Sequence, residues 1–290
     1  MNRYVYFNWF YDPSKPHFAR LKNVLLYSLN KYNKDLIIIE KELECPTCEH
    51  RTENDKKFQY LENIHKTQKW NEFFQSLNIG DEVLFLDADI LILNNISEMF
   101  DFLENKEIIL TTRNYKKLNF NAGVILFKVT ENTKRFFNEW TEKISKFSHE
   151  IRFNQEIIKL SEIYLGAGQT TLAYMIEKEE YKNIIDKVPC HIWNCCQQDW
   201  DLYTDETKII HVKSGLRKLI FEKSVRKKST IIKLAKIWLE YENEMIESDP
   251  EKYKDLQINN TQELNKEINN MITPIRRKKS IKIKSKRRYW

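Results

Sequence analysis

Two carboxylates lie inside the most hydrophobic run of the chain, EVLFLDADILILNNI, over residues 82–96. Four apolar residues precede Asp87 and four follow Asp89. A continuous apolar run of this length predicts a strand buried on both faces. An unpaired buried carboxylate is costly or shifts its pKa, so the two acids need a partner. Because alternate residues of a strand point the same way, both can face one site, where a divalent cation bridging to phosphate oxygens is a suitable partner.

The elements that must position this pair alternate between strands and helices. The pattern predicts strands at 3–9, 35–40, 83–93, 107–112, 122–128, 183–189 and 207–212, and helices at 17–32, 56–77, 96–103 and 133–147. Such alternation indicates an α/β fold. In open α/β sheets, ligands bind at the carboxyl ends of strands. Five candidate site residues lie at such ends: Trp9, Tyr11, Asp12, Asp87 and Asp89.

Length and composition indicate a globular protein. The chain has 290 residues, of which 41% are hydrophobic and 31% charged, and no run of 18 apolar residues predicts a transmembrane helix. The N-terminus has no small-residue cleavage site, and five cysteines suit a reducing cytosol better than a disulfide framework. We therefore expect a cytoplasmic protein, with a main domain over 1–222, a polar helical extension over 223–274 and a tail over 275–290.

The net charge of +6 is concentrated in that tail, IRRKKSIKIKSKRRYW, which holds nine basic residues and no acidic ones. The rest of the chain carries 39 basic against 42 acidic residues, so the body is mildly acidic. A basic block of this kind is usually flexible and often binds polyanions.

Four segments follow one another along the chain in this order: FLDADILIL, FNAGVILFK, VPCHIWN and IIHVKSGLRK. Together they resemble nucleotide-sugar glycosyltransferases of the GT-A fold, and most of all the family of glycogenin and the bacterial lipopolysaccharide galactosyltransferases, over roughly residues 3–220. The resemblance implies a GT-A (Rossmann-like) mixed sheet flanked by helices, with a helical C-terminal appendage. It also implies metal-dependent transfer of a sugar, from a UDP-sugar to a hydroxyl acceptor, with retention of configuration.

The same resemblance assigns a metal site. Asp89 matches the metal-binding Asp of the family, Asp87 the acid that helps with metal or ribose, and His211 the late histidine that completes the site. Carboxylates with one imidazole suit Mn²⁺, with Mg²⁺ as the alternative.

A late cationic cluster is implied to hold the donor diphosphate. In the family a Gly follows the His by three residues and a Lys by six, whereas here Gly215 follows by four and Lys218 by seven. Gly215 would let the backbone approach the diphosphate, and either Lys218 or Arg217 would supply the cation.

The first loop, NWFYDPSKP, matches the family's nucleotide-base loop in position. Asp12 can accept from a pyrimidine N–H, and Tyr11 or Trp9 can stack on the ring, although Trp9 also suits a core position. Lys66 and Lys69 lie on the helix predicted over 56–77, before the strand with the two aspartates. The family often has a basic residue near the phosphates there; the alternative is a solvated helix face.

Asn121, in FNAGV, matches the Asn that the family uses on the donor sugar. The family then shows Asp-Gln ahead of a helix, for which Gly168-Gln169 is the nearest match, so Gln169 is retained and the acid is missing. The segment 154–156, Asn-Gln-Glu, is a second alignment. If Glu156 lay near the acceptor, an inverting mechanism with a carboxylate base would compete.

The tail is the main clue to the acceptor. By resemblance it rests on an anionic membrane surface, since Tyr289 and Trp290 are interfacial residues beside Arg and Lys, and the acceptor is a lipopolysaccharide or other glycan. Two alternatives stay open: the tail tracks DNA whose hydroxymethylated bases are glycosylated, or it is solvated with no partner. A function of another class is a nucleic-acid-binding protein with a degenerate transferase body. The intact set Asp87, Asp89, Asn121 and His211 argues against that.

The cysteines offer a further possibility, a structural zinc site. One C-x-x-C pair and a distant CHIWNCC segment are a weak signal, so idle thiols are the simpler interpretation. The candidate ligands are Cys45, Cys48, Cys190, His191, Cys195 and Cys196.

Overall fold

The structure is a computed structural model that describes residues 1–12, 15–44, 55–113, 119–164, 166–222, 229–256 and 266. Its strands are β1 (Arg3–Tyr11), β2 (Ile37–Glu44), β3 (Glu82–Leu86), β4 (Ile90–Ile92), β5 (Ile108–Thr112), β6 (Phe120–Lys128), β7 (Ile185–Pro189) and β8 (Ile209–His211). The α-helices are α1 (His17–Tyr32), α2 (Asp55–Gln75), α3 (Glu131–Ser145), α4 (Phe147–Phe153), α5 (Gln155–Ile163), α6 (Ala167–Ile176), α7 (Glu179–Lys182), α8 (Cys190–Trp193), α9 (Ser214–Glu222) and α10 (Ser229–Ser248). Short 3₁₀ turns are η1 (Ser97–Leu103), η2 (Trp200–Leu202) and η3 (Lys254–Leu256).

The main sheet has six strands in the order β2-β1-β3-β6-β5-β7. β1 runs parallel to β2 and β3, and β5 parallel to β7, while β6 is antiparallel to both β3 and β5. A separate sheet pairs β4 with β8 in antiparallel fashion. The predicted mixed α/β architecture is therefore present.

The acidic run does not form the single strand predicted over 83–93. β3 is fully buried, with Val83 and Phe85 packed into one core cluster and Leu84 and Leu86 into another, as its two-sided burial predicts. At Asp87 the chain leaves the sheet through a turn, and β4 then pairs with β8 instead. The turn removes both carboxylates from the ladder, where ionised groups would be desolvated without partners.

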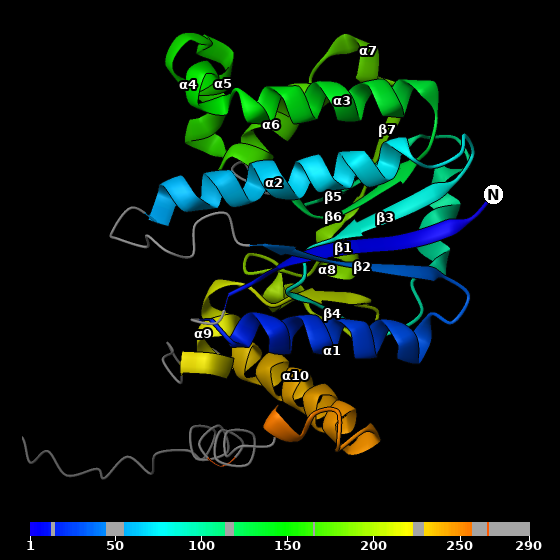
Figure 1. Ribbon diagram of the computed structural model, residues 1–290, viewed down its shortest axis with the longest axis vertical. Coiled ribbons are helices and arrows are strands. Elements are labelled where there is room, and N and C mark those ends of the chain that lie inside the picture. Colours follow the sequence, from blue (N-terminus) through cyan, green and yellow to red (C-terminus); the bar gives the residue numbers. More distant parts are fainter. Residues whose placement is uncertain are drawn as a thin grey trace, which may run out of the picture.

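Helices cover both faces of the main sheet (Figure 1). On one face α2, α3 and α6 enclose an aromatic-rich core that includes Trp70, Phe85, Phe127 and Phe137. On the other face lie the small sheet and α1, and α10 packs beyond them. The carboxyl ends of β1 and β3 thus open at one edge of the molecule, between α2 and α9 (Figure 1).

The helix α10 packs against α1 and α9. Glu242 accepts two hydrogen bonds from the Arg20 guanidinium, at 2.7 and 2.6 Å, and the fully buried Trp238 lies edge-on to Phe221. Among the described helices, none combines the length and hydrophobicity that crossing a bilayer requires. The basic tail over 275–290, most of residues 257–274, and Cys45 and Cys48 lie outside the described residues.

Candidate functional site

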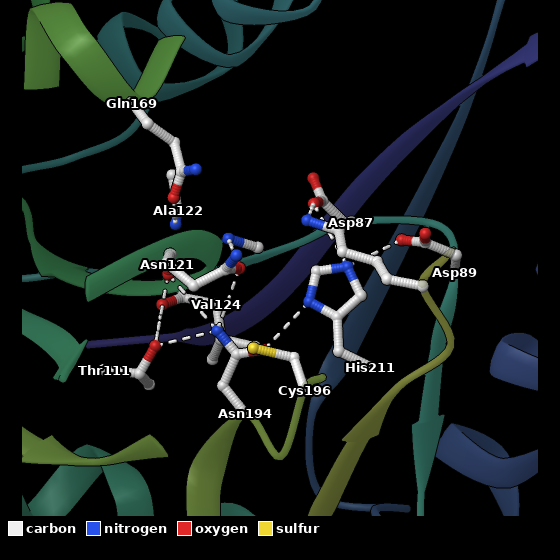
Figure 2. Close-up of polar contacts among 12 residues, drawn as sticks. Asp87, Asp89, Thr111, Asn121, Ala122, Val124, Gln169, Asn194, Cys196 and His211 are labelled. Carbon is white, nitrogen blue, oxygen red and sulfur yellow. Dashed lines mark hydrogen bonds and ion pairs between the residues drawn. The ribbon is translucent and has the colours of Figure 1, made fainter. Parts of the chain in front are cut away.

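The site centres on the turn Asp87–Ala88–Asp89, here called the acid turn. His211 Nε2 lies 2.9 Å from Asp89 Oδ1 and 3.4 Å from Asp87 Oδ2 (Figure 2). The small sheet creates this meeting, because Ile90, next to the turn, pairs directly with His211 across β4 and β8. Within the described ranges, these three residues are the one group of at least three possible ligands whose ligand atoms lie close enough, within 4.8 Å of one another, to hold a metal ion.

An uncharged hydrogen-bond network holds His211 on the side away from the acid turn. Asn194 donates through Nδ2 to Thr111 Oγ1 at 2.8 Å and to the Asn121 backbone oxygen at 3.2 Å, which orients its amide. The Asn194 Oδ1 oxygen therefore faces His211 Nδ1, at 2.9 Å, and accepts its proton (Figure 2). With the Nδ1 position protonated, the lone pair of Nε2 points toward the two carboxylates.

The charge states favour cation binding at this point. Burial raises the pKa of Asp87, but Lys66 and then Lys213 outweigh it and hold that pKa well below its ordinary value. For Asp89, burial is likewise outweighed, by His211 while its Nε2 carries a proton and by Lys213, and its pKa is also lowered. Burial and Lys213 lower the pKa of His211, so the imidazole is neutral near pH 7. Two ionised carboxylates and a neutral nitrogen are acceptors that fit a hard or borderline divalent cation.

Three cations face the acid turn from its open side. Lys66 forms an ion pair with Asp87, and its Nζ also lies 4.3 Å from the centre of the Trp70 ring. Lys213 Nζ is 3.4 Å from Asp87 Oδ2, and Arg217 Nη1 is 3.5 Å from Asp89 Oδ2. All three side chains are partly exposed, so they can move to another anion that enters the site.

Close packing explains the glycine of the FNAG segment. A Cβ atom at Gly123 would lie 2.2 Å from His211 Cε1 and 2.8 Å from Asn121 Oδ1. Asn121 Oδ1 itself accepts from the Gly123 N–H at 2.9 Å. Only a residue without a side chain leaves room for the histidine at this position of β6.

Two cavities flank the acid turn and share Asn63, Lys66 and Asp87. The larger, called the aromatic cavity, has a volume of about 280 Å³, and its other lining residues include Asn8, Trp9, Phe10, Asp12, Phe18, Glu62, Asp89 and Arg217. The smaller, called the lysine cavity, has a volume of about 160 Å³, and its other lining residues include Trp70, Gly123, Gly166, Gly168, Gln169 and Lys213.

The first-loop candidates and Lys69 divide between the cavities and the surface. Trp9 is buried and donates to Glu40 through its indole nitrogen at 3.0 Å, yet it also lines the aromatic cavity, as Asp12 does. Tyr11 is 52% exposed. Lys69 pairs with Glu72 on the outer face of α2, so Lys66 is the helix lysine that reaches the site.

The later candidates divide in the same way. Arg217 lines the aromatic cavity, whereas Lys218 is exposed on α9, and Gly215 lies near Ile231 and Trp200. Gln169 lines the lysine cavity and accepts from the Ala122 N–H at 3.3 Å (Figure 2). The second alignment falls on α5, where Asn154 caps the helix and Glu156 is exposed.

Three residues of the site escaped the sequence interpretation. Asn194 ends the VPCHIWN segment and Lys213 follows His211 by two, so both lay within quoted motifs without a role of their own. Asn8 lines the aromatic cavity and donates to the Lys66 backbone oxygen at 3.2 Å, next to the first-loop residues already singled out.

The cysteines of the described part are buried free thiols rather than a metal-binding group. Burial raises the pKa of Cys190 to about 12 and that of Cys196 to about 11. Arg113 donates to Cys196 Sγ at 2.8 Å, so this thiol takes part in a hydrogen bond within the protein.

A protein-family model described as nucleotide-diphospho-sugar transferase matches residues 20–209. No curated protein matches the chain. Among solved structures, the apo-form glycosyltransferase GlyE of Streptococcus pneumoniae is 14% identical, with a TM-score of 0.50 and coverage of 93% of this chain and 64% of GlyE. A glycosyltransferase involved in glycosylating the major capsid of PBCV-1 is 11% identical (83% and 98% covered, TM-score 0.49), and the galactosyltransferase LgtC is 14% identical (87% and 99%, TM-score 0.49).

Proposed function

The chain belongs to the nucleotide-diphospho-sugar transferase family, and on that premise we propose that it is a metal-dependent transferase that uses a UDP-sugar. The family and the GT-A fold are those that the sequence predicts, and they make the chain a nucleotide-sugar glycosyltransferase. The identity of the nucleoside, the metal and the acceptor are parts of the proposal.

The observation that carries the proposal is the convergence of three acceptors, Asp87, Asp89 and His211 Nε2, between two cavities. These residues would hold Mn²⁺ or Mg²⁺. A bound divalent ion supplies Lewis-acid stabilisation of the diphosphate leaving group. The protein's own contribution is positioning: Asn194 holds the imidazole, and Arg217 brings a permanent positive charge beside the acid turn.

The two cavities suit the two ends of the donor. The aromatic cavity is the larger, and Trp9, Phe10 and Phe18 line it, which suits a planar base, while Asp12 can accept from a ring N–H. The smaller lysine cavity then takes the sugar, and the diphosphate spans the acid turn between them. In this orientation the anomeric carbon lies near Gln169, which lines the lysine cavity, while Asn121 belongs to the buried network behind His211.

The arrangement supports retention of configuration. Among the described residues that line the lysine cavity, Asp87 is the one carboxylate, and it is already paired with Lys66 and Lys213. The described lining of this cavity therefore places no second acid to deprotonate an acceptor from the opposite side of the sugar. The bond from the anomeric carbon to the diphosphate oxygen breaks, the acceptor oxygen bonds on the same face, and the leaving oxygen takes the hydroxyl proton.

For the acceptor we propose a lipopolysaccharide or other glycan hydroxyl at an anionic membrane surface, in the cytoplasm. The support is the sequence of the basic tail, which ends in Tyr289 and Trp290. DNA with hydroxymethylated bases is the competing acceptor, since the same tail suits phosphates. Comparing binding to anionic vesicles and to duplex DNA at two salt concentrations, with and without residues 275–290, separates the two.

The experiment that tests the donor is a panel of UDP-sugars with Mn²⁺, scored by released UDP. We expect hydrolysis of at least one donor and its loss on adding a chelator, with recovery on adding Mn²⁺ back. Equal rates with and without the chelator would refute the metal-dependent proposal. A panel of other nucleoside diphosphate sugars serves as the control for base selection.

A further inference from the structure

The lysine cavity has an unusual balance of charge for a site that binds a neutral sugar. Lys66 and Lys213 both line it, and Asp87 is the one acidic residue in its described lining. The other acids near the site, Asp12 and Glu62, line the aromatic cavity instead. Once the acid turn holds a divalent cation, that cation neutralises the negative charge of Asp87, which then no longer balances both lysines.

The amino end of α6 adds further positive character to the same cavity. Gly166, Gly168 and Gln169 line the cavity, and no side chain caps this ten-residue helix at Gly166. Its first turn contains no acidic residue. The first N–H groups of a helix have no partner within the helix, and the helix dipole favours an anion beside them.

The missing acid of the Asp-Gln pair is a glycine in this chain, and that residue faces the cavity. A Cβ atom at Gly168 would lie 3.1 Å from Asn63 Oδ1, so the glycine also lets α6 approach α2 closely. Apart from Asp87, the charged and helix-end groups of the cavity are donors: two ammonium groups and the N–H groups of the first turn of α6. Sugar hydroxyls need acceptors as well, whereas a carboxylate only accepts.

We propose that the transferred sugar carries a carboxylate, so that the donor is a UDP-hexuronate, with its carboxylate held by Lys213 and the amino end of α6. This inference rests on the proposed function and names its donor class. The diphosphate, placed across the acid turn, has Arg217 and Lys66 as its cations, since both line the aromatic cavity, whereas Lys213 lines the lysine cavity and not the aromatic one.

Matched donors test the proposal directly. We would measure kcat/KM for hydrolysis, and donor binding by calorimetry with Mn²⁺, for UDP-glucuronate against UDP-glucose and for UDP-galacturonate against UDP-galactose. Each pair differs only in a carboxylate against a hydroxymethyl group. We expect the uronate to be preferred at least tenfold in one pair, and Lys213→Met to reduce that preference while Lys187→Met, an exposed lysine on β7, leaves it intact.

A second variant tests the cavity without removing a cation. Gly168→Asp restores an acid where this chain has none, and Gly168→Asn has nearly the same shape without the charge. We expect Gly168→Asp to abolish or invert the preference for the uronate and Gly168→Asn to keep it, with thermal melting showing that both variants fold.

The outcomes separate this inference from the proposed function. Preference for the neutral sugar in both pairs, with metal-dependent hydrolysis intact, overturns the uronate and leaves the transferase proposal standing; an anionic acceptor would then explain the cavity. Metal-independent hydrolysis, or none with any donor, overturns both.

Discussion

The acid turn has two contrasting sides. The inner side, formed by His211, Asn194, Asn121 and Thr111, is buried and uncharged, and its members are joined by hydrogen bonds between 2.8 and 3.2 Å. The outer side consists of Lys66, Lys213 and Arg217, three flexible cations whose side chains remain 21–33% exposed.

The difference separates geometry from charge. Buried, fully paired polar groups hold one arrangement, because breaking them leaves unsatisfied atoms in a low-dielectric interior. Long cationic side chains at a cavity wall can exchange one anion for another at small cost. The inner side therefore fixes where a metal would bind, and the outer side can transfer its charge from the carboxylates to the anionic groups of an incoming donor.

The severest test removes a carboxylate that contacts both sides. Asp89→Asn keeps the shape of the side chain but loses the charge that faces His211 and Arg217. We expect kcat/KM with the preferred donor to fall at least about 1000-fold, or roughly 4 kcal/mol, with Mn²⁺ binding lost by calorimetry. The exposed acid Asp186 provides the control, since Asp186→Asn should leave both unchanged. Full activity of Asp89→Asn in chelator would contradict the metal site.

The next test breaks the inner side alone. Gly123→Ala must displace His211, since the added Cβ would lie 2.2 Å from its ring, so we expect about a 100-fold loss of kcat/KM and weaker Mn²⁺ binding. Gly215→Ala is the matched control, because its Cβ meets other atoms only at 3.8 Å or more and it lines neither cavity. Equal, strong losses in both variants would instead place Gly215 against the diphosphate, as the sequence resemblance implies.

A third test addresses the outer side and the choice between two neighbouring cations. Arg217→Met removes the guanidinium that lies 3.5 Å from Asp89, and we expect donor KM to rise about 10- to 100-fold, or roughly 1.4 to 2.7 kcal/mol. Lys218→Met changes an exposed residue of the same helix and should alter KM less than about threefold. The reverse ranking in donor titrations would mean that α9 rotates when the donor binds.

The sequence predicted which candidate ligands come together better than it predicted the elements that carry them. Asp87, Asp89 and His211 could be grouped because each belongs to a recognisable motif, and the two-sided burial of β3 follows from its apolar run. The break after Leu86 could not be predicted, because it depends on the pairing of β4 with β8, more than a hundred residues away. Local hydrophobicity is the same on both sides of that break.

The sequence also could not predict which of two neighbouring helix residues faces the site. Lys66 and Lys69 lie on adjacent parts of one face of α2, since three residues turn a helix by about 300°. Packing decides between them: Lys66 lies over the Trp70 ring beside Asp87, while Glu72 holds Lys69 outside. Asn194 was missed for a similar reason, because its role arises only where β5, β6 and β8 meet.

The mildest test titrates the inner side with protons. His211 binds a metal only when its imidazole is neutral, and its pKa is lowered below the ordinary value of 6.5 by burial and by Lys213. Protons compete with the metal as the pH falls through that pKa, so affinity is nearly complete at pH 8 and is lost progressively as the pH drops below 6.5. At pH 6.5 the loss must stay below about twofold, because less than half of the histidine is protonated.

Mn²⁺ binding followed by electron paramagnetic resonance from pH 8 to 5 would check this, with the surface variant His149→Gln as control. A decline centred above pH 6.5 would show that the carboxylates, and not burial, govern the imidazole, and the inner side would then be charged in the resting protein.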